Sequence, residues 1–235
     1  MKNYTSPNFN QRTSNEIKYL ILHYTGMATG KEALERLCDE SSAVSAHYLI
    51  EEDGEVFSLV DEENRAWHSG VSCWEDDADI NDLSIGIEIV NSGHPYPGYE
   101  SVYRSFPDVQ MNSVIKLSQE IITRHNIKPW HILGHSDVAW QRKIDPGELF
   151  NWKRLAEEGV GLWPKSENID KQQEVDIKGF LIKMATYGYD TEKGEEEYVK
   201  LVSAFQRHFR QNNIDGAVDP ETVSILDYLL EKKAS

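Results

Sequence analysis

One segment constrains the fold more than any other. Ile17–Tyr24, with the sequence IKYLILHY, is almost continuously apolar and rich in residues that favour β-strands. Such a run is typical of a central strand in a sheet that is covered on both faces. A second run, Ser84–Asn91 (SIGIEIVN), places Ile85, Ile87 and Ile89 on one face of a strand. The two runs together predict a sheet at the centre of the molecule.

Strand and helix patterns alternate along this part of the chain. Helices are expected over Lys31–Glu40, which contains good helix formers, and over Met111–Asn126, where apolar residues recur at helical spacing. The segment His47–Val60 has β-rich arms around Asp53-Gly54, a strong hairpin signal, and Trp130–His135 predicts a short strand. The alternation predicts an α/β fold with a mixed central β-sheet flanked by helices.

A polar stretch divides the chain. Residues 165–174 (KSENIDKQQE) contain no aromatic side chain, so we expect a linker there, between a domain over 1–164 and a second domain over 175–235. The second region contains three helical patterns, and Asp219-Pro220 is typical of an N-cap followed by the first helical position. These patterns predict a small three-helix domain, near the lower size limit for independent folding.

Charge and hydropathy exclude several classes of function. The chain of 235 residues has 24 Lys and Arg against 40 Asp and Glu, a net charge of −16, which disfavours general binding to nucleic-acid phosphates. No apolar run approaches the ~20 residues needed to cross a bilayer. The first residues contain no apolar signal-peptide core. As written, the sequence predicts a cytoplasmic protein; the alternative is the periplasm or cell envelope, if an export signal has been removed.

The cysteines carry no evident chemistry. Cys38 and Cys73 form no CxxC pair and give neither a redox nor a zinc-finger signal. Buried free thiols are the expected state, with a single disulfide as the alternative.

Two histidines end apolar strands: His23 in LILHYT and His135 in HILGH. A strand leaving the core delivers its last side chain to the rim of the sheet, so the two imidazoles can meet if the strands are neighbours. Two imidazoles and a carboxylate form a usual catalytic zinc set. Asp145, in the turn-rich loop after His135, is the leading carboxylate. His131 is a poorer partner for His135, because residues four apart on a strand lie ~13 Å apart.

Two further residues suit chemistry at a metal-bound water. Glu88 lies mid-strand, on the face opposite the three isoleucines. A buried carboxylate there is costly unless it is used, and burial raises its pKa toward that of a general acid/base. Lys143, two residues before Asp145, could stabilise an oxyanion. Each residue has an ordinary alternative when taken alone: a structural histidine, a salt-bridged glutamate or a solvated lysine.

The order of the segments resembles one family. LHYT, HYLIEEDGEV, AWHSGVSCW, DLSIGIEIVN and GHSDVAWQRKIDPG follow one another as in the zinc-dependent N-acetylmuramoyl-L-alanine amidases (amidase_2), which are related to peptidoglycan recognition proteins. The resemblance runs from about Ile17 to Pro164. The tail, LVSAFQRHFR…IDGAVDPETVSIL, is similar to the three-helix peptidoglycan-binding domain.

The resemblance implies a role for each candidate residue. The zinc ligands fall on His23, His135 and Asp145, with one Zn²⁺ per chain, and the catalytic residues fall on Glu88 and Lys143.

The segment AWHSG resembles the part of the family that lines the cleft. The resemblance therefore implies that Trp67 and His68 contact sugar or peptide, and that His47 lies near the site as a supporting or substrate-binding residue.

The implied reaction is hydrolysis of the amide between the lactyl group of N-acetylmuramic acid and L-alanine of the stem peptide, in cell-wall turnover or recycling. Peptidoglycan and muropeptides, including 1,6-anhydro-muropeptides, are the expected partners. The alternative is a non-catalytic muropeptide-binding protein, which typically lacks a zinc ligand; here all three expected ligands are present. A purely structural wall anchor would leave Glu88 and the order of the motifs unexplained.

Overall fold

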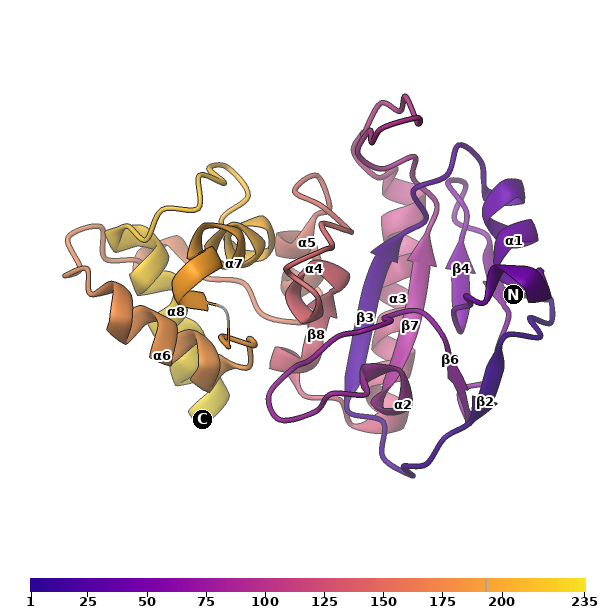
Figure 1. The fold of residues 1–235 in the computed structure, drawn as a ribbon, viewed down its shortest axis with the longest axis horizontal. Helices are drawn as coiled ribbons and strands as arrows, with labels where there is room; N and C mark the ends of the chain where they lie inside the picture. The colour runs from indigo at the N-terminus through magenta and orange to yellow at the C-terminus, as the bar shows by residue number, and fades with distance from the viewer. Residues whose placement is uncertain (193) are drawn as a thin grey trace.

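The computed structural model describes residues 1–192 and 194–235 (Figure 1). Its strands are β1 (Lys2–Asn3), β2 (Phe9–Gln11), β3 (Tyr19–Tyr24), β4 (Tyr48–Ile50), β5 (Val56–Ser58), β6 (Asn64–Ala66), β7 (Ser84–Ile89) and β8 (Ile132–Gly134). Its α-helices are α1 (Gly30–Cys38), α2 (Ile80–Leu83), α3 (Asp108–His125), α4 (His135–Val138), α5 (Trp152–Glu157), α6 (Ile177–Tyr187), α7 (Gly194–Phe209) and α8 (Pro220–Ala234).

The main sheet has six strands in the order β1-β5-β4-β7-β3-β8, and β2 pairs with β6 in a separate ribbon. The neighbours β4, β7, β3 and β8 are parallel, whereas β4 and β5 form the antiparallel hairpin expected around Asp53-Gly54. The predicted α/β fold with a mixed central sheet flanked by helices is therefore confirmed. The sequence patterns missed β1, β2 and β6, which have only two or three residues each.

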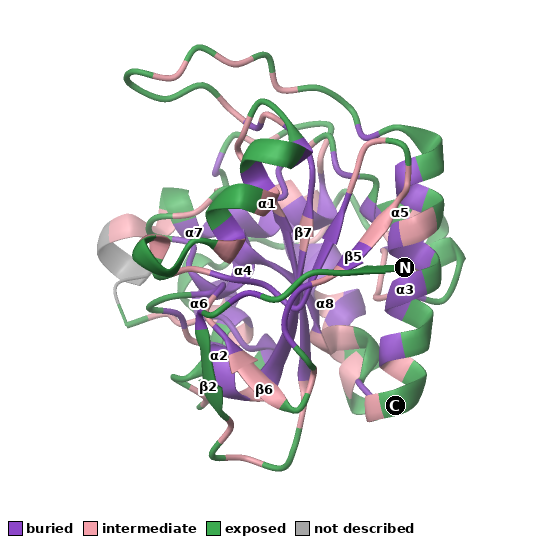
Figure 2. Cartoon of the chain, turned by 90° about the vertical axis from the view of Figure 1, so that its right-hand side faces the viewer, coloured by how far each residue is buried: buried purple, intermediate pink, exposed green. Residues whose placement is uncertain are grey.

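The two faces of the sheet carry different side chains. Ile85, Ile87 and Ile89 of β7 pack with Leu20 and Leu22 of β3 in a buried cluster that α3 completes. The alternation of side chains along a strand sends Glu88 and His23 to the opposite face. Figure 2 shows that the strands at the centre are buried while the outer faces of the surrounding helices are exposed. The opposite face is also packed along part of its length, since Tyr19 and Ile21 of β3 belong to a second buried cluster. Only the end of that face, at His23 and Glu88, is left for a site.

The C-terminal helices α6, α7 and α8 lie beyond β8, next to α4 and α5 (Figure 1). One hydrophobic cluster contains Tyr19 and Ile21 of β3 together with Phe180 of α6 and Phe205 of α7. The C-terminal helices thus share a continuous core with the sheet.

The segment 165–174 is docked as well. Ile169 packs against the shared cluster, and the Asp170 amide donates to Ser224 Oγ in α8 at 2.8 Å. The domain boundaries at 1–164, 165–174 and 175–235 stay predictions. Both cysteines are free, as expected, but each is partly exposed rather than buried. Within the described residues, no helix has the length and apolar character needed to cross a membrane.

Candidate active site

The strand register brings the candidate residues together. His23 and Glu88 are direct partners in the parallel pair β3 and β7. Leu22 pairs with Gly134 in β8, so His135 directly follows the next strand along the same edge. Because parallel neighbours end at the same edge of a sheet, three side chains from distant parts of the chain reach one rim.

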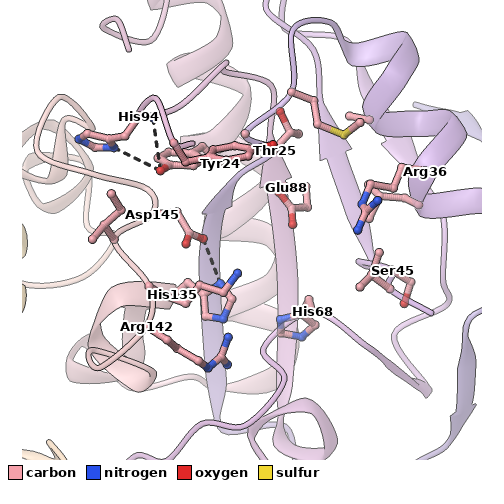
Figure 3. A pocket seen from close by; sticks show the side chains of 18 of the residues that line it. Tyr24, Thr25, Arg36, Ser45, His68, Glu88, His94, His135, Arg142 and Asp145 are labelled. Atoms are coloured by element: carbon pink, nitrogen blue, oxygen red, sulfur yellow. Dashed lines mark hydrogen bonds and ion pairs between the residues drawn. The ribbon is translucent and has the colours of Figure 1, made fainter. Parts of the chain in front are cut away.

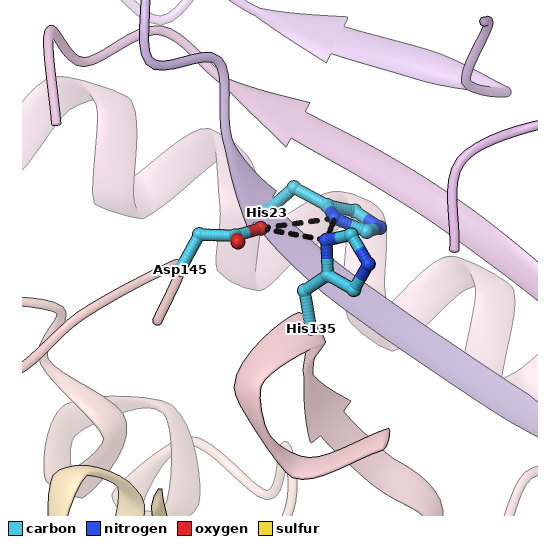
Figure 4. Close-up of side chains that lie close together, drawn as sticks. All are labelled: His23, His135 and Asp145. Atoms are coloured by element: carbon cyan, nitrogen blue, oxygen red, sulfur yellow. Dashed lines mark hydrogen bonds and ion pairs between the residues drawn. The ribbon is translucent and has the colours of Figure 1, made fainter. Parts of the chain in front are cut away.

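His23, His135 and Asp145 converge there (Figure 4). His23 Nδ1 lies 3.0 Å from His135 Nδ1, and Asp145 Oδ2 lies 3.1 Å from each of these nitrogens. All three side chains are buried. Two imidazole nitrogens and one carboxylate oxygen are the donors of a catalytic zinc site with an open fourth position.

The second ring nitrogen of His135 fixes which nitrogen can bind a metal. His135 Nε2 lies 3.0 Å from the carbonyl oxygen of Ser69, which can only accept. The proton is therefore on Nε2, and Nδ1 presents a lone pair to the centre of the site.

A chain of hydrogen bonds fixes His23 in the same way. The Ser84 hydroxyl donates to the Ile80 carbonyl at 2.6 Å, so Ser84 Oγ accepts from His68 Nε2 at 3.2 Å. His68 Nδ1 is then an acceptor, and His23 Nε2 donates to it at 3.0 Å. His23 Nδ1 is left with a lone pair that faces the lone pair of His135. Two such nitrogens at 3.0 Å repel each other unless a cation lies between them, so these residues fit a zinc ion.

The charges of the site agree with this donor set. Burial acts most strongly on the pKa of Asp145 and would raise it, but His135 and His23 outweigh burial and lower it, so the carboxylate is ionised. Burial, followed by the adjacent His135, lowers the pKa of His23 to about 4, which keeps the imidazole neutral at neutral pH. An ionised carboxylate and a neutral imidazole are the forms that bind zinc.

Glu88 faces the same cavity (Figure 3). Its Oε2 is buried and has no hydrogen-bond partner in the described part of the chain. Burial raises the pKa of Glu88 well above its ordinary value; Asp145 adds to this rise and Lys143 opposes it. A carboxyl group with an unpaired oxygen and a raised pKa is equipped to accept and return a proton.

The cavity has a volume of about 570 Å³. Its lining includes Lys143, His135 and Asp145 as well as Trp67 and His68. Within the described residues, the Lys143 ammonium makes neither a hydrogen bond nor an ion pair, so it is available to a bound molecule.

The profile of the N-acetylmuramoyl-L-alanine amidase family (Amidase_2) matches residues 13–148. The chain belongs to this family. It is 37% identical to the N-acetylmuramoyl-L-alanine amidase AmiD of Escherichia coli over 232 residues, covering 92% of this chain and 83% of AmiD. The 1,6-anhydro-N-acetylmuramyl-L-alanine amidase AmpD of Enterobacter cloacae is 40% identical over 114 residues, covering 48% of this chain and 56% of AmpD.

Solved structures agree with this assignment. AmiD of E. coli in complex with the substrate anhydro-N-acetylmuramic acid-L-Ala-D-gamma-Glu-L-Lys superposes with a TM-score of 0.83 at 35% identity, covering 95% of this chain and 93% of AmiD. AMPDH3 of Pseudomonas aeruginosa superposes with a TM-score of 0.86 at 33% identity over 100% of both chains. The chain is an N-acetylmuramoyl-L-alanine amidase, a hydrolase of cell-wall recycling.

Two histidines of this amidase have settings that the sequence did not indicate. His68 lines the cavity, but its ring nitrogens face His23 and Ser84. His47 is buried and does not line the cavity: the Gly86 amide donates to its Nδ1 at 3.0 Å, and its Nε2 lies 3.1 Å from the Asn64 carbonyl. The geometry therefore gives His68 a direct contact with His23, a candidate metal ligand, and His47 a role in joining β7 to the chain around β6.

The third of the expected substrate-contacting residues is Trp67. It lines the cavity, and its Nε1 donates to Asn10 Oδ1 at 2.7 Å, which fixes the ring against the N-terminal segment. Sequence reasoning did not find Ser69, whose carbonyl orients His135, or Ser84 at the end of the His68 chain. Neither serine belongs to a spacing pattern, so no signal in the sequence indicates them.

Proposed function

We propose that this amidase binds one Zn²⁺ per chain through His23 Nδ1, His135 Nδ1 and Asp145 Oδ2, and thereby cleaves the amide between the lactyl group of N-acetylmuramic acid and L-alanine. One observation carries the proposal: inside the protein, the lone pairs of two imidazole nitrogens and an ionised carboxylate oxygen all face the same point. Bound zinc would supply a Lewis acid and acidify water at neutral pH.

Glu88 and Lys143 supply the rest of the chemistry in this proposal. The unpartnered Glu88 carboxylate takes the proton of the attacking water and returns it to the departing alanine nitrogen. Its raised pKa makes this carboxylate a stronger base than an ordinary glutamate, which favours the uptake of the proton. The free Lys143 ammonium reduces the negative charge that develops on the carbonyl oxygen.

The substrate class follows from the relatives. AmiD of E. coli was solved with an anhydromuramoyl tripeptide, and AMPDH3 with anhydromuramic pentapeptide. We infer that this chain also takes 1,6-anhydro-muropeptides. A cavity of about 570 Å³ lies within the range of small-molecule sites. In this proposal Trp67 contacts the sugar or peptide, while His68 acts by orienting His23.

Metal analysis of purified protein tests the proposed ligand set. The wild-type chain should contain one zinc, and His135→Ala should lose it, because a ligand and its lone pair are removed. Lys165→Ala, a change at an exposed position, is the control and should keep its zinc. Full zinc retention in His135→Ala would refute the assignment.

The C-terminal region is proposed to bind polymeric peptidoglycan, on the strength of its similarity to the three-helix peptidoglycan-binding domain. Intact Glu88→Gln protein, which should not digest the wall, can be sedimented with sacculi in excess soluble anhydromuropeptide. Persistent sedimentation is expected, since the soluble fragment occupies only the catalytic cavity. If the soluble fragment releases the protein completely, the cleft alone binds the wall and the tail is no anchor.

The rival function, muropeptide binding without hydrolysis, predicts a protein that retains muropeptides unchanged. The complete set of three ligand donors and Glu88 favours the enzyme. The cytoplasmic location stays a prediction, which fractionation of the native host tests.

A further inference from the structure

A buried carboxylate lies directly behind the metal site. Asp137, two residues after His135, is fully buried in α4. Its Oδ2 accepts from the Gly134 amide at 2.7 Å and from His208 Nδ1 at 2.7 Å, and its Oδ1 accepts from the Tyr189 hydroxyl at 2.6 Å. A carboxylate is tolerated inside a protein only with donors of this kind. Two of these three donors come from the C-terminal region.

Asp137 fixes the turn that presents the metal ligand. Helix α4 has only four residues, with His135 at its first position, and the bond from Gly134 to Asp137 caps it. The Ser136 amide donates to the Asp145 carbonyl at 2.9 Å, so the same turn also holds the loop of the third ligand. A one-turn helix has little stability of its own, and its geometry depends on these contacts.

The two C-terminal donors are held firmly. The His208 ring is stacked between Trp152 and Phe209, each at a centroid distance of 3.8 Å. Tyr189 packs against Trp74 and Phe205. Burial beside Asp137 raises the pKa of Tyr189 well above its ordinary value, so its hydroxyl remains a donor.

The docking continues beyond these two donors. Trp140 Nε1, just after α4, donates to the Asp190 carbonyl at 2.8 Å, and Gln211 Nε2 donates to the Phe150 carbonyl at 2.7 Å. The C-terminal region thus contacts the loop of the metal site from both of its ends.

We propose that Tyr189 and His208 are positioning residues for the metal ligand His135, acting through Asp137. The inference rests on the proposed zinc site. It gives the C-terminal helices a task besides wall binding: they hold the metal loop in the geometry that binds zinc tightly. When one donor is removed, the buried Asp137 carboxylate loses one of the hydrogen bonds that stabilise its charge, and the turn that carries His135 relaxes.

A pair of adjacent tyrosines offers a matched test. Tyr187 and Tyr189 are both buried in the same cluster, but only Tyr189 donates to Asp137; within the described residues the Tyr187 hydroxyl makes no hydrogen bond. Full-length Tyr189→Phe and Tyr187→Phe each lose one hydroxyl and nothing else. Competition with a chelator measures the zinc dissociation constant of each folded protein. Removing a group that supports a metal ligand typically weakens binding about 10–100-fold, and we expect about tenfold for Tyr189→Phe and no change for Tyr187→Phe.

Two variants of His208 test whether an N–H group at the original position preserves zinc affinity. An asparagine at position 208 places an amide N–H near the original Nδ1, whereas a glutamine places it near Nε2. Since Nδ1 donates to Asp137, His208→Asn should stay closer to wild-type zinc affinity than His208→Gln. Replacing zinc by Co²⁺ gives a second readout: the visible spectrum should change in Tyr189→Phe and not in Tyr187→Phe.

Equal zinc affinity and equal Co²⁺ spectra in the two folded tyrosine variants would overturn the inference, and this comparison decides even if the histidine variants do not fold. A wild-type chain that binds no zinc would instead refute the proposed function. Wild-type zinc binding with unchanged Tyr189→Phe would refute the positioning role alone.

Discussion

Glu88 is subject to two opposing demands. Its carboxylate is buried, one of its oxygens has no hydrogen-bond partner among the described residues, and Asp145 is a negatively charged neighbour. All three features disfavour the ionised form. Proton transfer nevertheless requires a carboxyl group at this point of the cavity. Functional sites commonly retain such a destabilising group, and its replacement then stabilises the fold while removing activity.

Glu88→Gln should therefore keep the fold and the metal while losing most turnover, because the amide has the same shape but cannot transfer the proton. General acid/base catalysis typically contributes about 10²–10⁴-fold. Turnover of a soluble anhydromuropeptide measures this loss, and near-wild-type turnover would rule out Glu88 as the acid/base.

The same variant should melt at a higher temperature than the wild type at neutral pH. The folded-state pKa of Glu88 lies above the ordinary value of 4.5, so the group disfavours folding increasingly as pH rises from 4.5 to its folded pKa. Thermal melts at pH 4.5 and pH 8 should show a larger gain at pH 8. An equal gain at both pH values would contradict the raised pKa.

At this scale, part of the site could be predicted. The ends of apolar strands indicated His23 and His135, and strand alternation placed Glu88 on the face opposite the three isoleucines. The contacts of His68 and His47 could not be predicted, because they depend on how the chain around β6 packs onto β7.

The element that organises this packing is β7, and its glycine has a specific task. A Cβ at Gly86 would lie within 2.5–2.6 Å of the His68 ring. The missing side chain therefore leaves the space in which His68 reaches His23 and Ser84. A glycine inside a strand often marks such a close approach.

Gly86→Ala should displace His68 and remove the hydrogen bond that orients His23. We expect zinc affinity to fall about 10–100-fold, as for other contacts that support metal ligands. Ile87→Val, in the same strand but on the opposite face, is the control: it should cost about 0.5–1.5 kcal/mol of stability and leave zinc affinity unchanged. Equal zinc affinity in the two variants would show that His68 does not orient His23.

Long elements could be predicted and short ones could not. The periodicity of Met111–Asn126 indicated α3, and the Asp53-Gly54 signal indicated the β4–β5 hairpin. The one-turn helix α4 was missed, because four residues carry no periodicity and its conformation depends on Asp137 and its partners.

Across the whole molecule, the C-terminal helices close onto the sheet rather than extending from it. Besides the shared core, Glu75 joins the two regions: it accepts from Lys233 Nζ of α8 at 2.5 Å and lies 3.3 Å from His131 Nε2. The hydrogen bond with His131 and the one with Lys233 together lower the pKa of Glu75 to about 2, against the opposing effect of burial.

This contact should make the docking sensitive to acid. The folded-state pKa of Glu75 lies below the ordinary value of 4.5, so its stabilisation is fully present above pH 4.5 and is lost as pH falls toward 2. Glu75→Gln should reduce the dependence of unfolding free energy on pH in this window. Glu167→Gln, an exposed glutamate without an ion pair among the described residues, is the control. Denaturant unfolding at a series of pH values measures both; identical slopes would exclude the Glu75 contact as a source of acid sensitivity.

The polar composition of 165–174 predicted a separation of two regions, but the extent of their contact could not be predicted. A helical pattern such as the one that contains Phe180 gives only an apolar face, and a face does not identify its partner. The shared cluster depends on contacts between β3, near the start of the chain, and helices near its end.

The most direct test of the account is the identity of the bond that is cut. Purified chain should be incubated with a soluble anhydromuramoyl tripeptide, and the products should be identified by mass spectrometry. We predict two products, anhydro-N-acetylmuramic acid and an intact peptide with a new N-terminal L-alanine, with release that stops after zinc removal and resumes when zinc is restored. Cleavage at another bond, or undiminished release from zinc-free protein, would contradict the account.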